Sequence, residues 1–379
     1  MHSPCFLSAP PGSVVRRYVL RKKPKGKLLP SAHAIDREYR IMTALRGSSV
    51  PVPMTYCLCS DASVIGTPFF VMEYLQGRIF KDITLPGMDR KQRFAIYADQ
   101  ARVLANLHRL DPVSLGLADF GPRDGKYLSR QVKRWSGQYQ AAKVDDLPAM
   151  DELIGKLEGA LPSIAAEESA RTSIIHGDYR LDNLMFHPTE PRVIGVLDWE
   201  LATLGHPISD LAYNCMVWHI PAGAGSAAMP GLEGLPLRLK GLPSESEYVR
   251  AYCRMVARCG PIVKADWNYF VALSFFRSAA ILQGVYKRSL QGNASQSDSS
   301  ATFRKVVPLI VQKALGVLDG SDDSATSEQQ ADSFEKANIR ATLGCFNLRP
   351  QFWELHQKLT AFSQFGGHHT HEALCKRKI

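Results

Sequence analysis

A short stretch in the middle of the chain concentrates residue types that handle phosphate and metal. In residues 174–200, IIHGDYRLDNLMFHPTEPRVIGVLDWE, Asn183 follows Asp178 by five positions and Asp198 ends a second apolar run. Carboxylate and carboxamide oxygens are the ligands that Mg²⁺ prefers. A carboxylate held beside the metal can accept a proton from an attacking hydroxyl. Together the three side chains predict magnesium-assisted chemistry at a hydroxyl, whereas either Asp alone would be read as the cap of a strand or turn.

A β-hairpin would bring these side chains together. The segments LMFH, PTEPR and VIGVL read as strand, turn and strand. An antiparallel hairpin places the residue before its first strand next to the residue after its second, and these residues are Asn183 and Asp198. The β-like run SIIHGD delivers Asp178 to the same end.

Three neighbouring residues have less specific signals. His176 is predicted to support the loop by hydrogen bonding rather than to act chemically. Arg180 lies between the candidate base and the candidate metal ligand, where it would either meet a phosphate or pair with Asp182. Asp210, in GHPISDLA, is interpreted as structural, because it resembles an acid that supports the catalytic loop in the enzyme family identified below.

The elements that must position this stretch fall into two groups. Residues 1–75 read as strand, helix, strand, strand, which predicts a small β-rich lobe. Residues 76–318 are dominated by helical periodicity, with helices predicted near 94–108, 127–142, 150–160, 247–258, 267–290 and 303–318. Residues 319–379 begin with SDDSATSEQQADS and are predicted to be a linker and a tail of low order. The fold class is therefore α+β, with two lobes.

Composition limits the classes of partner and the cellular compartment that fit this protein. The chain has 379 residues, 45% of them hydrophobic, and a formal net charge of +10, with seven basic residues and no acid in the run 16–27. Such charge fits acidic partners, but the basic run coincides with a predicted strand and lacks interleaved aromatic residues, which disfavours nucleic acid. Eight scattered Cys without a regular framework indicate reduced thiols. No apolar run of about 18 residues and no signal peptide are evident, so the expectation is an intracellular protein without a membrane span.

The motif resembles the catalytic core of protein-kinase-like phosphotransferases, in which H-x-D-x-x-x-x-N is followed by a metal-binding Asp. Gly177 after the His, and D-W-E around Asp198, look like the aminoglycoside phosphotransferase and choline kinase branch. YVLRKKPKG, IDREYRIMTAL, VMEYLQGRIF and LDWELATLGHPISDLA resemble the kinase-like domain of acyl-CoA dehydrogenase family members ten and eleven, over residues 15–318.

This resemblance implies a bilobal protein-kinase-like fold that uses ATP and Mg²⁺. The implied catalytic residues are Asp178 as base, with His176 and Arg180 beside it, and the implied metal ligands are Asn183 and Asp198. The implied nucleotide-binding residues are Arg21, its partner Glu38, and the hinge residues Met72, Glu73 and Tyr74. The implied substrate is a hydroxylated acyl-CoA, and the implied compartment is mitochondrial or peroxisomal.

Alternatives remain at several positions. Arg21 also fits a solvated strand edge, and Glu38 fits an acid in the first turn of a helix. Only about 14 residues precede the strand at Val15, and SAPPG does not read as the strand, Gly-rich turn and strand that cover phosphates in kinases. The expectation is therefore a truncated first lobe, and a nucleotide-binding module with impaired turnover is the second hypothesis. His368, His369 and His371 are interpreted as a solvated run.

Overall fold

The computed structural model describes residues 3–5, 16–22, 35–164, 172–223, 230–256, 262–290 and 300–321. The chain divides into two compact units, residues 1–322 and 323–379, and the described residues all belong to the first. The predicted helical patch at 352–362 and the three His of the tail lie outside the described residues.

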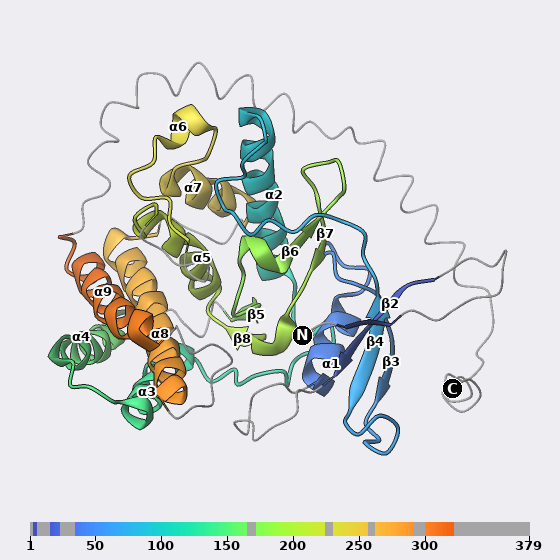
Figure 1. The fold of residues 1–379 in the computed structure, drawn as a ribbon, viewed down its shortest axis with the longest axis horizontal. Coiled ribbons are helices and arrows are strands. Elements are labelled where there is room, and N and C mark those ends of the chain that lie inside the picture. The colour runs from blue at the N-terminus through green and yellow to red at the C-terminus, as the bar shows by residue number, and fades with distance from the viewer. Residues whose placement is uncertain are drawn as a thin grey trace. The chain divides into compact units, whose positions relative to one another are not determined.

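A four-stranded antiparallel sheet with one helix forms the first lobe (Figure 1). Its order is β1-β2-β4-β3, with β1 at Ser3–Cys5, β2 at Tyr18–Lys22, β3 at Thr55–Cys59 and β4 at Phe69–Glu73. Helix α1, Ile35–Leu45, buries Ile35, Ile41, Met42 and Leu45, and among these apolar residues it also buries Glu38. A buried acid on an apolar helix face needs a cation, which the neighbouring strand β2 supplies.

The sequence predicts no strand before β2, and the structure differs on this point. Ser3–Cys5 pairs antiparallel with β2, with Pro4 opposite Val19. Three residues carry too little periodicity to be recognised from sequence, because strand assignment rests on alternation over a longer run. Residues 6–15, between β1 and β2, are outside the described part of the chain.

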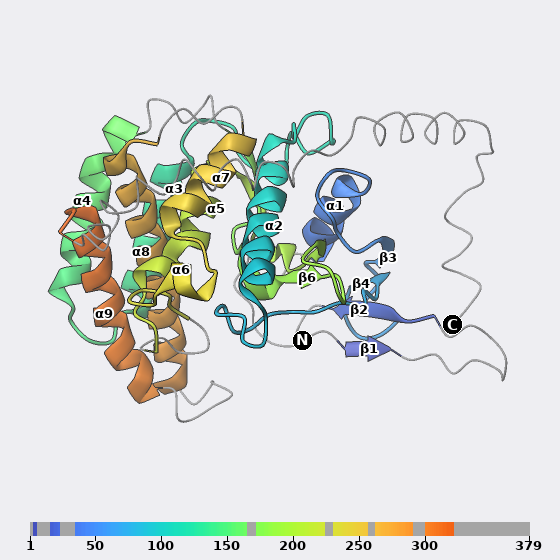
Figure 2. The same ribbon diagram turned by 90° about the horizontal axis from the view of Figure 1, so that it is seen from above.

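Helices dominate the second lobe (Figures 1 and 2). They are α2 at Arg90–Arg109, α3 at Tyr127–Ala142, α4 at Pro148–Ile164, α5 at Pro207–Cys215, α6 at Leu237–Lys240, α7 at Glu245–Met255, α8 at Lys264–Leu290 and α9 at Ser300–Leu318. Capping boxes start two of them: Asp89 with Gln92 at α2, and Ser244 with Glu247 at α7. The α+β fold with a small β-rich lobe and a larger helical lobe is as predicted.

Helix α8 is the centre of this lobe and packs on α9, α3 and α5. Within the described residues it is the one helix whose length and hydropathy would suit a membrane span, yet 67% of its apolar window is buried inside the protein. Its apolar residues contact neighbouring helices, so we interpret α8 as a core helix.

Two small antiparallel sheets carry the loops of interest. The predicted hairpin is present as β6, Leu184–Phe186, and β7, Val193–Val196. Strand β5, Ser173–Ile175, pairs with β8, Thr203–Gly205, a partner that the sequence analysis did not identify. The chain also forms short 3-10 turns at Leu181–Asn183, Trp199–Leu201 and Met216–His219.

Candidate active site

The β6–β7 hairpin sets the separation of the two candidate metal ligands. Leu184 pairs with Val196 in the ladder, and the next backbone bond, from Leu197 N to the carbonyl oxygen of Asn183, measures 2.9 Å. Asn183 and Asp198 therefore leave the same end of the hairpin. Asp198 adopts a left-handed backbone conformation, with φ 64° and ψ 62°, which turns the chain sharply after β7.

Asp210 fixes the loop that carries the candidate base. Its Oδ2 accepts a hydrogen bond from His176 N at 2.6 Å, and its Oδ1 accepts one from Gly177 N at 2.8 Å. The side chain is buried, which opposes ionisation, but the contact with His108, the nearby His176 and the backbone donors outweigh burial and lower the pKa of Asp210. Asp210 lies at the first turn of α5, where a helix N-terminus also favours an anion.

His176 connects the same loop to the end of β7. Its Nδ1 accepts from Asp178 N at 3.1 Å, which leaves Nε2–H to donate to the carbonyl oxygen of Leu197 at 2.8 Å. The ring is fully buried and tilts against Trp199. Both ring nitrogens are thus engaged by backbone groups, an arrangement that positions Asp178 relative to the hairpin.

Both oxygens of Asp178 accept hydrogen bonds. Tyr213 donates its hydroxyl to Oδ1 at 2.7 Å, and Asn183 donates Nδ2 to Oδ2 at 3.0 Å and to the carbonyl oxygen of Asp178 at 2.9 Å. Because Asn183 uses its amide nitrogen here, its amide oxygen remains the group to face a cation. Tyr213 was not predicted from the sequence, although it lies three residues after Asp210 and hence on the same face of α5.

Arg180 pairs with acids in this structure. Its Nη2 lies 2.8 Å from Asp182 Oδ2, and its Nε lies 3.5 Å from Asp178 Oδ1. Of the two alternatives that the sequence left open for Arg180, the structure contains the pairing with Asp182. These carboxylates outweigh the effect of burial and raise the pKa of Arg180.

Arg21 reaches from the first lobe to the end of the hairpin. Its Nε lies 3.0 Å from Glu38 Oε2, and its Nη2 lies 3.2 Å from Asp198 Oδ1 and 3.4 Å from Glu200 Oε2. Burial disfavours the charge, but the three carboxylates outweigh it and raise the pKa of Arg21. Lys22, the next residue of β2, is exposed, as strand alternation requires. The contribution of Glu200 to this cluster was not predicted.

The predicted hinge residues lie at the end of β4. Met72 is buried, Glu73 N donates to the carbonyl oxygen of Met54 at 2.8 Å, and the Glu73 carboxylate accepts from Met54 N at 3.1 Å. Tyr74 is exposed, and Arg17 lies 5.8 Å from its ring centroid. The backbone N–H and the carboxylate of Glu73 are thus both hydrogen-bonded to Met54. A ligand at the end of β4 would therefore contact the backbone that follows Glu73.

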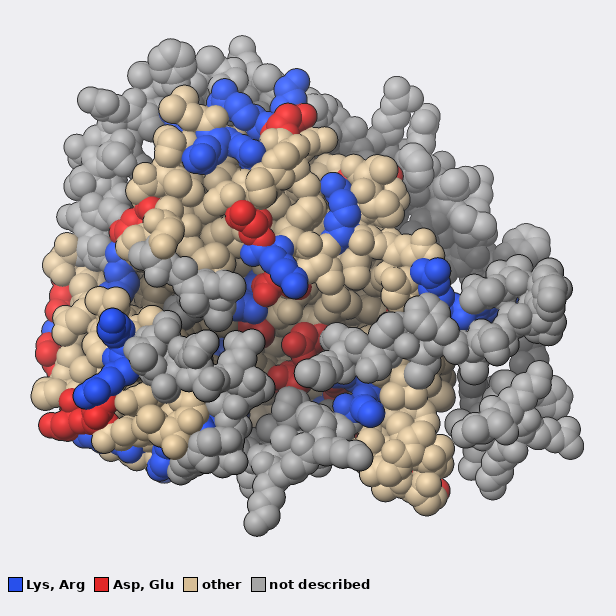
Figure 3. Space-filling view, in the orientation of Figure 1, with Lys and Arg blue, Asp and Glu red and all other residues tan. Residues whose placement is uncertain are grey.

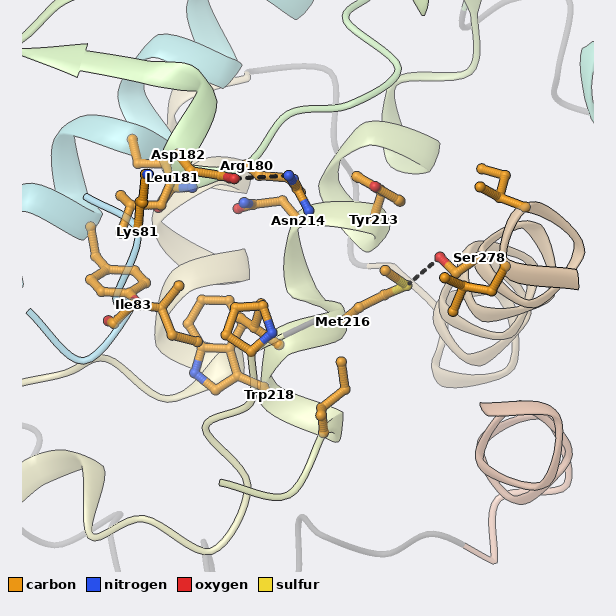
Figure 4. A pocket seen from close by; sticks show the side chains of 17 residues that line it. Lys81, Ile83, Arg180, Leu181, Asp182, Tyr213, Asn214, Met216, Trp218 and Ser278 are labelled. Atoms are coloured by element: carbon orange, nitrogen blue, oxygen red, sulfur yellow. Dashed lines mark hydrogen bonds and ion pairs between the residues drawn. The ribbon is translucent and has the colours of Figure 1, made fainter. Parts of the chain in front are cut away.

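A cavity of about 220 Å³ is lined by Arg180 and by Tyr213, the residue that donates a hydrogen bond to the candidate base Asp178. In Figure 4 the Arg180–Asp182 pair and Tyr213 lie along the upper side of the cavity, and Met216 and Trp218 lie below them. Most of its lining is apolar, including Ile83, Tyr97, Leu181, Met216, Val217, Trp218, Ile220, Pro230, Ile281 and Leu282. Such a cavity suits an apolar group attached to the atom that meets Asp178.

Charges are mixed over the described part of the face drawn in Figure 3, where Lys and Arg alternate with Asp and Glu. Within the described ranges, no group of three or more His, Cys, Asp or Glu has a metal-binding arrangement. Magnesium does not require one, since it takes one or two protein carboxylates and completes its shell with water and phosphate. The oxygens of Asn183 and Asp198 at one hairpin end fit that chemistry.

The small sheet lobe, the helical lobe and the loops around Asp178 and Asp198 define a kinase-like fold. The sequence pattern of the phosphotransferase enzyme family matches residues 11–245, and the chain belongs to this family. This confirms the resemblance on which the sequence analysis relied.

Individual relatives show which members of the phosphotransferase family this chain is similar to. The chain is 48% identical over 282 residues to mouse acyl-CoA dehydrogenase family member 10, covering 74% of this chain and 25% of that protein. It is 48% identical over 295 residues to human acyl-CoA dehydrogenase family member 11, covering 77% and 36%. It therefore spans well under half of the length of these relatives. A crystal structure from Ralstonia eutropha, described as a "putative aminoglycoside phosphotransferase", is 42% identical with a TM-score of 0.72, over 84% of this chain and 93% of that one.

Proposed function

We propose that this chain is an ATP- and Mg²⁺-dependent kinase that phosphorylates a hydroxyl group on an acyl-CoA-type small molecule. The observation that carries the proposal is the convergence of Asp178, Asn183 and Asp198 at one end of the β6–β7 hairpin, fixed by the Leu197 to Asn183 backbone bond of 2.9 Å. Membership of the phosphotransferase family supports the reaction class. In this proposal residues 1–75 bind the nucleotide and residues 76–318 carry the base and the metal ligands.

Each side chain then has a distinct task. Asn183 and Asp198 would hold Mg²⁺, which neutralises charge on the phosphates when it is bound. Asp178 would orient the substrate hydroxyl and accept its proton, since Tyr213 and Asn183 fix the carboxylate on both oxygens. Arg21, kept in place by Glu38, would contact the nucleotide phosphates, and the backbone after Glu73 would meet the adenine. Most of the rate gain in such reactions comes from positioning.

The cavity favours an apolar acceptor. The lining of the cavity next to Tyr213 and Arg180 is mostly apolar and includes one acid, Asp182, whereas a polycationic sugar would require several acidic side chains. The names of the two mammalian relatives refer to acyl-CoA chemistry. Both point to a hydroxylated acyl chain, in keeping with fatty-acid catabolism in a mitochondrial or peroxisomal compartment.

The test is phosphoryl transfer from [γ-³²P]ATP to a panel of hydroxyacyl-CoA substrates, with aminoglycosides and choline as comparison acceptors. Transfer to a hydroxyacyl-CoA, abolished in Asp178→Asn and by EDTA, supports the proposal. Transfer only to the comparison acceptors contradicts the substrate assignment.

A nucleotide-binding module without turnover is the second candidate. The contact between Arg21 and Asp198 favours it, because Arg21 already neutralises a carboxylate that the metal would need. A thermal shift with Mg·ATP, lost in Asp198→Asn, together with no transfer to any acceptor would establish this alternative. No shift at all would contradict both candidates.

A further inference from the structure

Two arginines meet at the junction of α3, α5 and α8, away from the nucleotide-side residues. Arg277 on α8 lies over two rings, with its Cζ 4.8 Å from the centroid of Tyr213 and 5.4 Å from that of Trp135. Arg134 on α3 lies 5.1 Å from the same Trp135 ring. Tyr213 is the residue that donates to Asp178. The arginine pair is therefore one side chain away from the candidate base.

Neither arginine has a carboxylate partner among the residues that the structure describes, and the Nε of Arg277 is buried without a hydrogen-bond acceptor. This separates them from Arg21 and Arg180, which also approach the site but have acidic partners. Arg134 is an exposed residue of α3, but desolvation by its neighbours and the charge of Arg277 lower the pKa of its guanidinium. Two like charges that disfavour each other, with no acid between them, are relieved by an anion from outside.

We infer that Arg134 and Arg277 bind an anionic group, a phosphate or a carboxylate, of the molecule whose hydroxyl meets Asp178. The inference rests on the proposed function for the identity of the hydroxyl-bearing molecule. Guanidinium groups offer several N–H donors in a planar fork, which matches the oxygens of phosphate and carboxylate. Both guanidinium groups lie close to the ring of Trp135, at 5.1 and 5.4 Å from its centroid. The acceptor is thus required to carry negative charge as well as an apolar part.

A purely structural role for the pair is the competing explanation. Stacking on Trp135 and Tyr213 alone would join α3 and α5 to α8. Such a clamp would affect folding stability but not the binding of anions, so binding measurements separate the two.

The first experiment uses magnesium-free pyrophosphate as the probe and thermal unfolding as the readout. We expect pyrophosphate to raise the Tm of the wild type and of Asp198→Asn, and to leave the Tm of the double variant Arg134→Met/Arg277→Met unchanged. A wild-type shift that the double variant retains, or no shift in the wild type, overturns the inference. Acetate in place of pyrophosphate tells a carboxylate site from a phosphate site.

The second experiment separates the inference from the proposed function. If Mg·ATP gives no shift while the pyrophosphate shift depends on the two arginines, the proposed function fails and the anion site stands. With an active kinase, Arg134→Met should raise the KM for a phosphate-bearing acceptor about tenfold and leave the KM for ATP unchanged. Arg277→Lys should raise the KM for the acceptor less than Arg277→Met does, because Lys keeps the positive charge. An equal rise in both KM values would contradict an acceptor site.

Discussion

The Nη2 atom of Arg21, on strand β2, lies 3.2 Å from Oδ1 of Asp198, at the far end of the β6–β7 hairpin. The same guanidinium lies 3.0 Å from Glu38 on α1. One cation from the first lobe therefore joins an acid of its own lobe to an acid of the second. The contact couples the position of the sheet to the position of the candidate metal ligand.

Arg21→Met should destabilise the protein strongly. Glu38 is only 4% exposed, and removal of its cation leaves a buried carboxylate without compensation, at a cost of about 3 kcal/mol in the free energy of unfolding. Urea unfolding followed by circular dichroism measures the change. Lys22→Met, at the exposed neighbouring position, is the matched control and should change stability by less than about 0.5 kcal/mol. Similar losses in both variants would show that Arg21 and Glu38 are not coupled.

Asp210→Asn should weaken the fold in a pH-dependent way. The pKa of Asp210 lies below its usual value, so the ionised carboxylate adds stability above the unfolded-state pKa of about 3.9, and this stability is lost as the pH falls through the folded-state pKa. Near pH 7 we expect a loss of about 2 kcal/mol, because the amide would direct a donor at a backbone N–H. The difference from wild type should shrink below pH 4.

The control for this experiment is Asp36→Asn, at an exposed position in the first turn of α1. At pH 7 it should change the free energy of unfolding by less than about 0.5 kcal/mol. A constant difference between Asp210→Asn and wild type from pH 7 to pH 3 would be incompatible with a depressed pKa.

Gly177→Ala should displace the loop that carries Asp178. Gly177 has φ +82°, and an added Cβ would lie 2.7 Å from the carbonyl oxygen of Leu201. Gly47, with φ +78°, has nothing within 4 Å of an added Cβ. Gly47→Ala should therefore show only the backbone penalty, about 1 kcal/mol, whereas Gly177→Ala should lose more stability and most phosphoryl transfer. Equal losses in the two variants, measured by urea unfolding, would exclude the contact with Leu201 as the cause.

Tyr213→Phe should slow phosphoryl transfer while the protein stays folded. The substitution removes the 2.7 Å hydrogen bond to Asp178 Oδ1. Loss of a hydrogen bond to a charged group should decrease kcat roughly tenfold or more. Tyr179→Phe removes a hydroxyl from the adjacent loop residue, whose bond goes to the carbonyl oxygen of Gln100 on α2. It should reduce stability slightly and leave kcat nearly unchanged. A drop of the same size in both variants would assign the effect to general packing.

The sequence was sufficient where local geometry decides the outcome. A hairpin relates Asn183 to Asp198 through its register alone, so their proximity follows from two apolar runs and a turn. The placement of Arg21 on the inner face of β2 follows from alternation in the same way. Helix periodicity likewise located α3, α8 and α9 to within a few residues.

The rest depends on packing between distant segments. Tyr213 meets Asp178 because α5 lies against the catalytic loop, and Arg277 meets Tyr213 because α8 packs on α5. Strand β8 has three residues and pairs with β5 some thirty positions earlier, which no local pattern records. Contacts of this kind are fixed by the whole core and are not visible in residue spacing.

The left-handed conformation of Asp198, φ 64° and ψ 62°, also bears on how such a chain evolves. Among residues with a side chain, Asn and Asp tolerate this region best. A lineage that abandoned metal chemistry would keep its fold most easily by replacing Asp198 with Asn, which preserves the turn and removes the charge. Among descendants that have lost kinase activity, Asn is therefore the residue expected in place of Asp198.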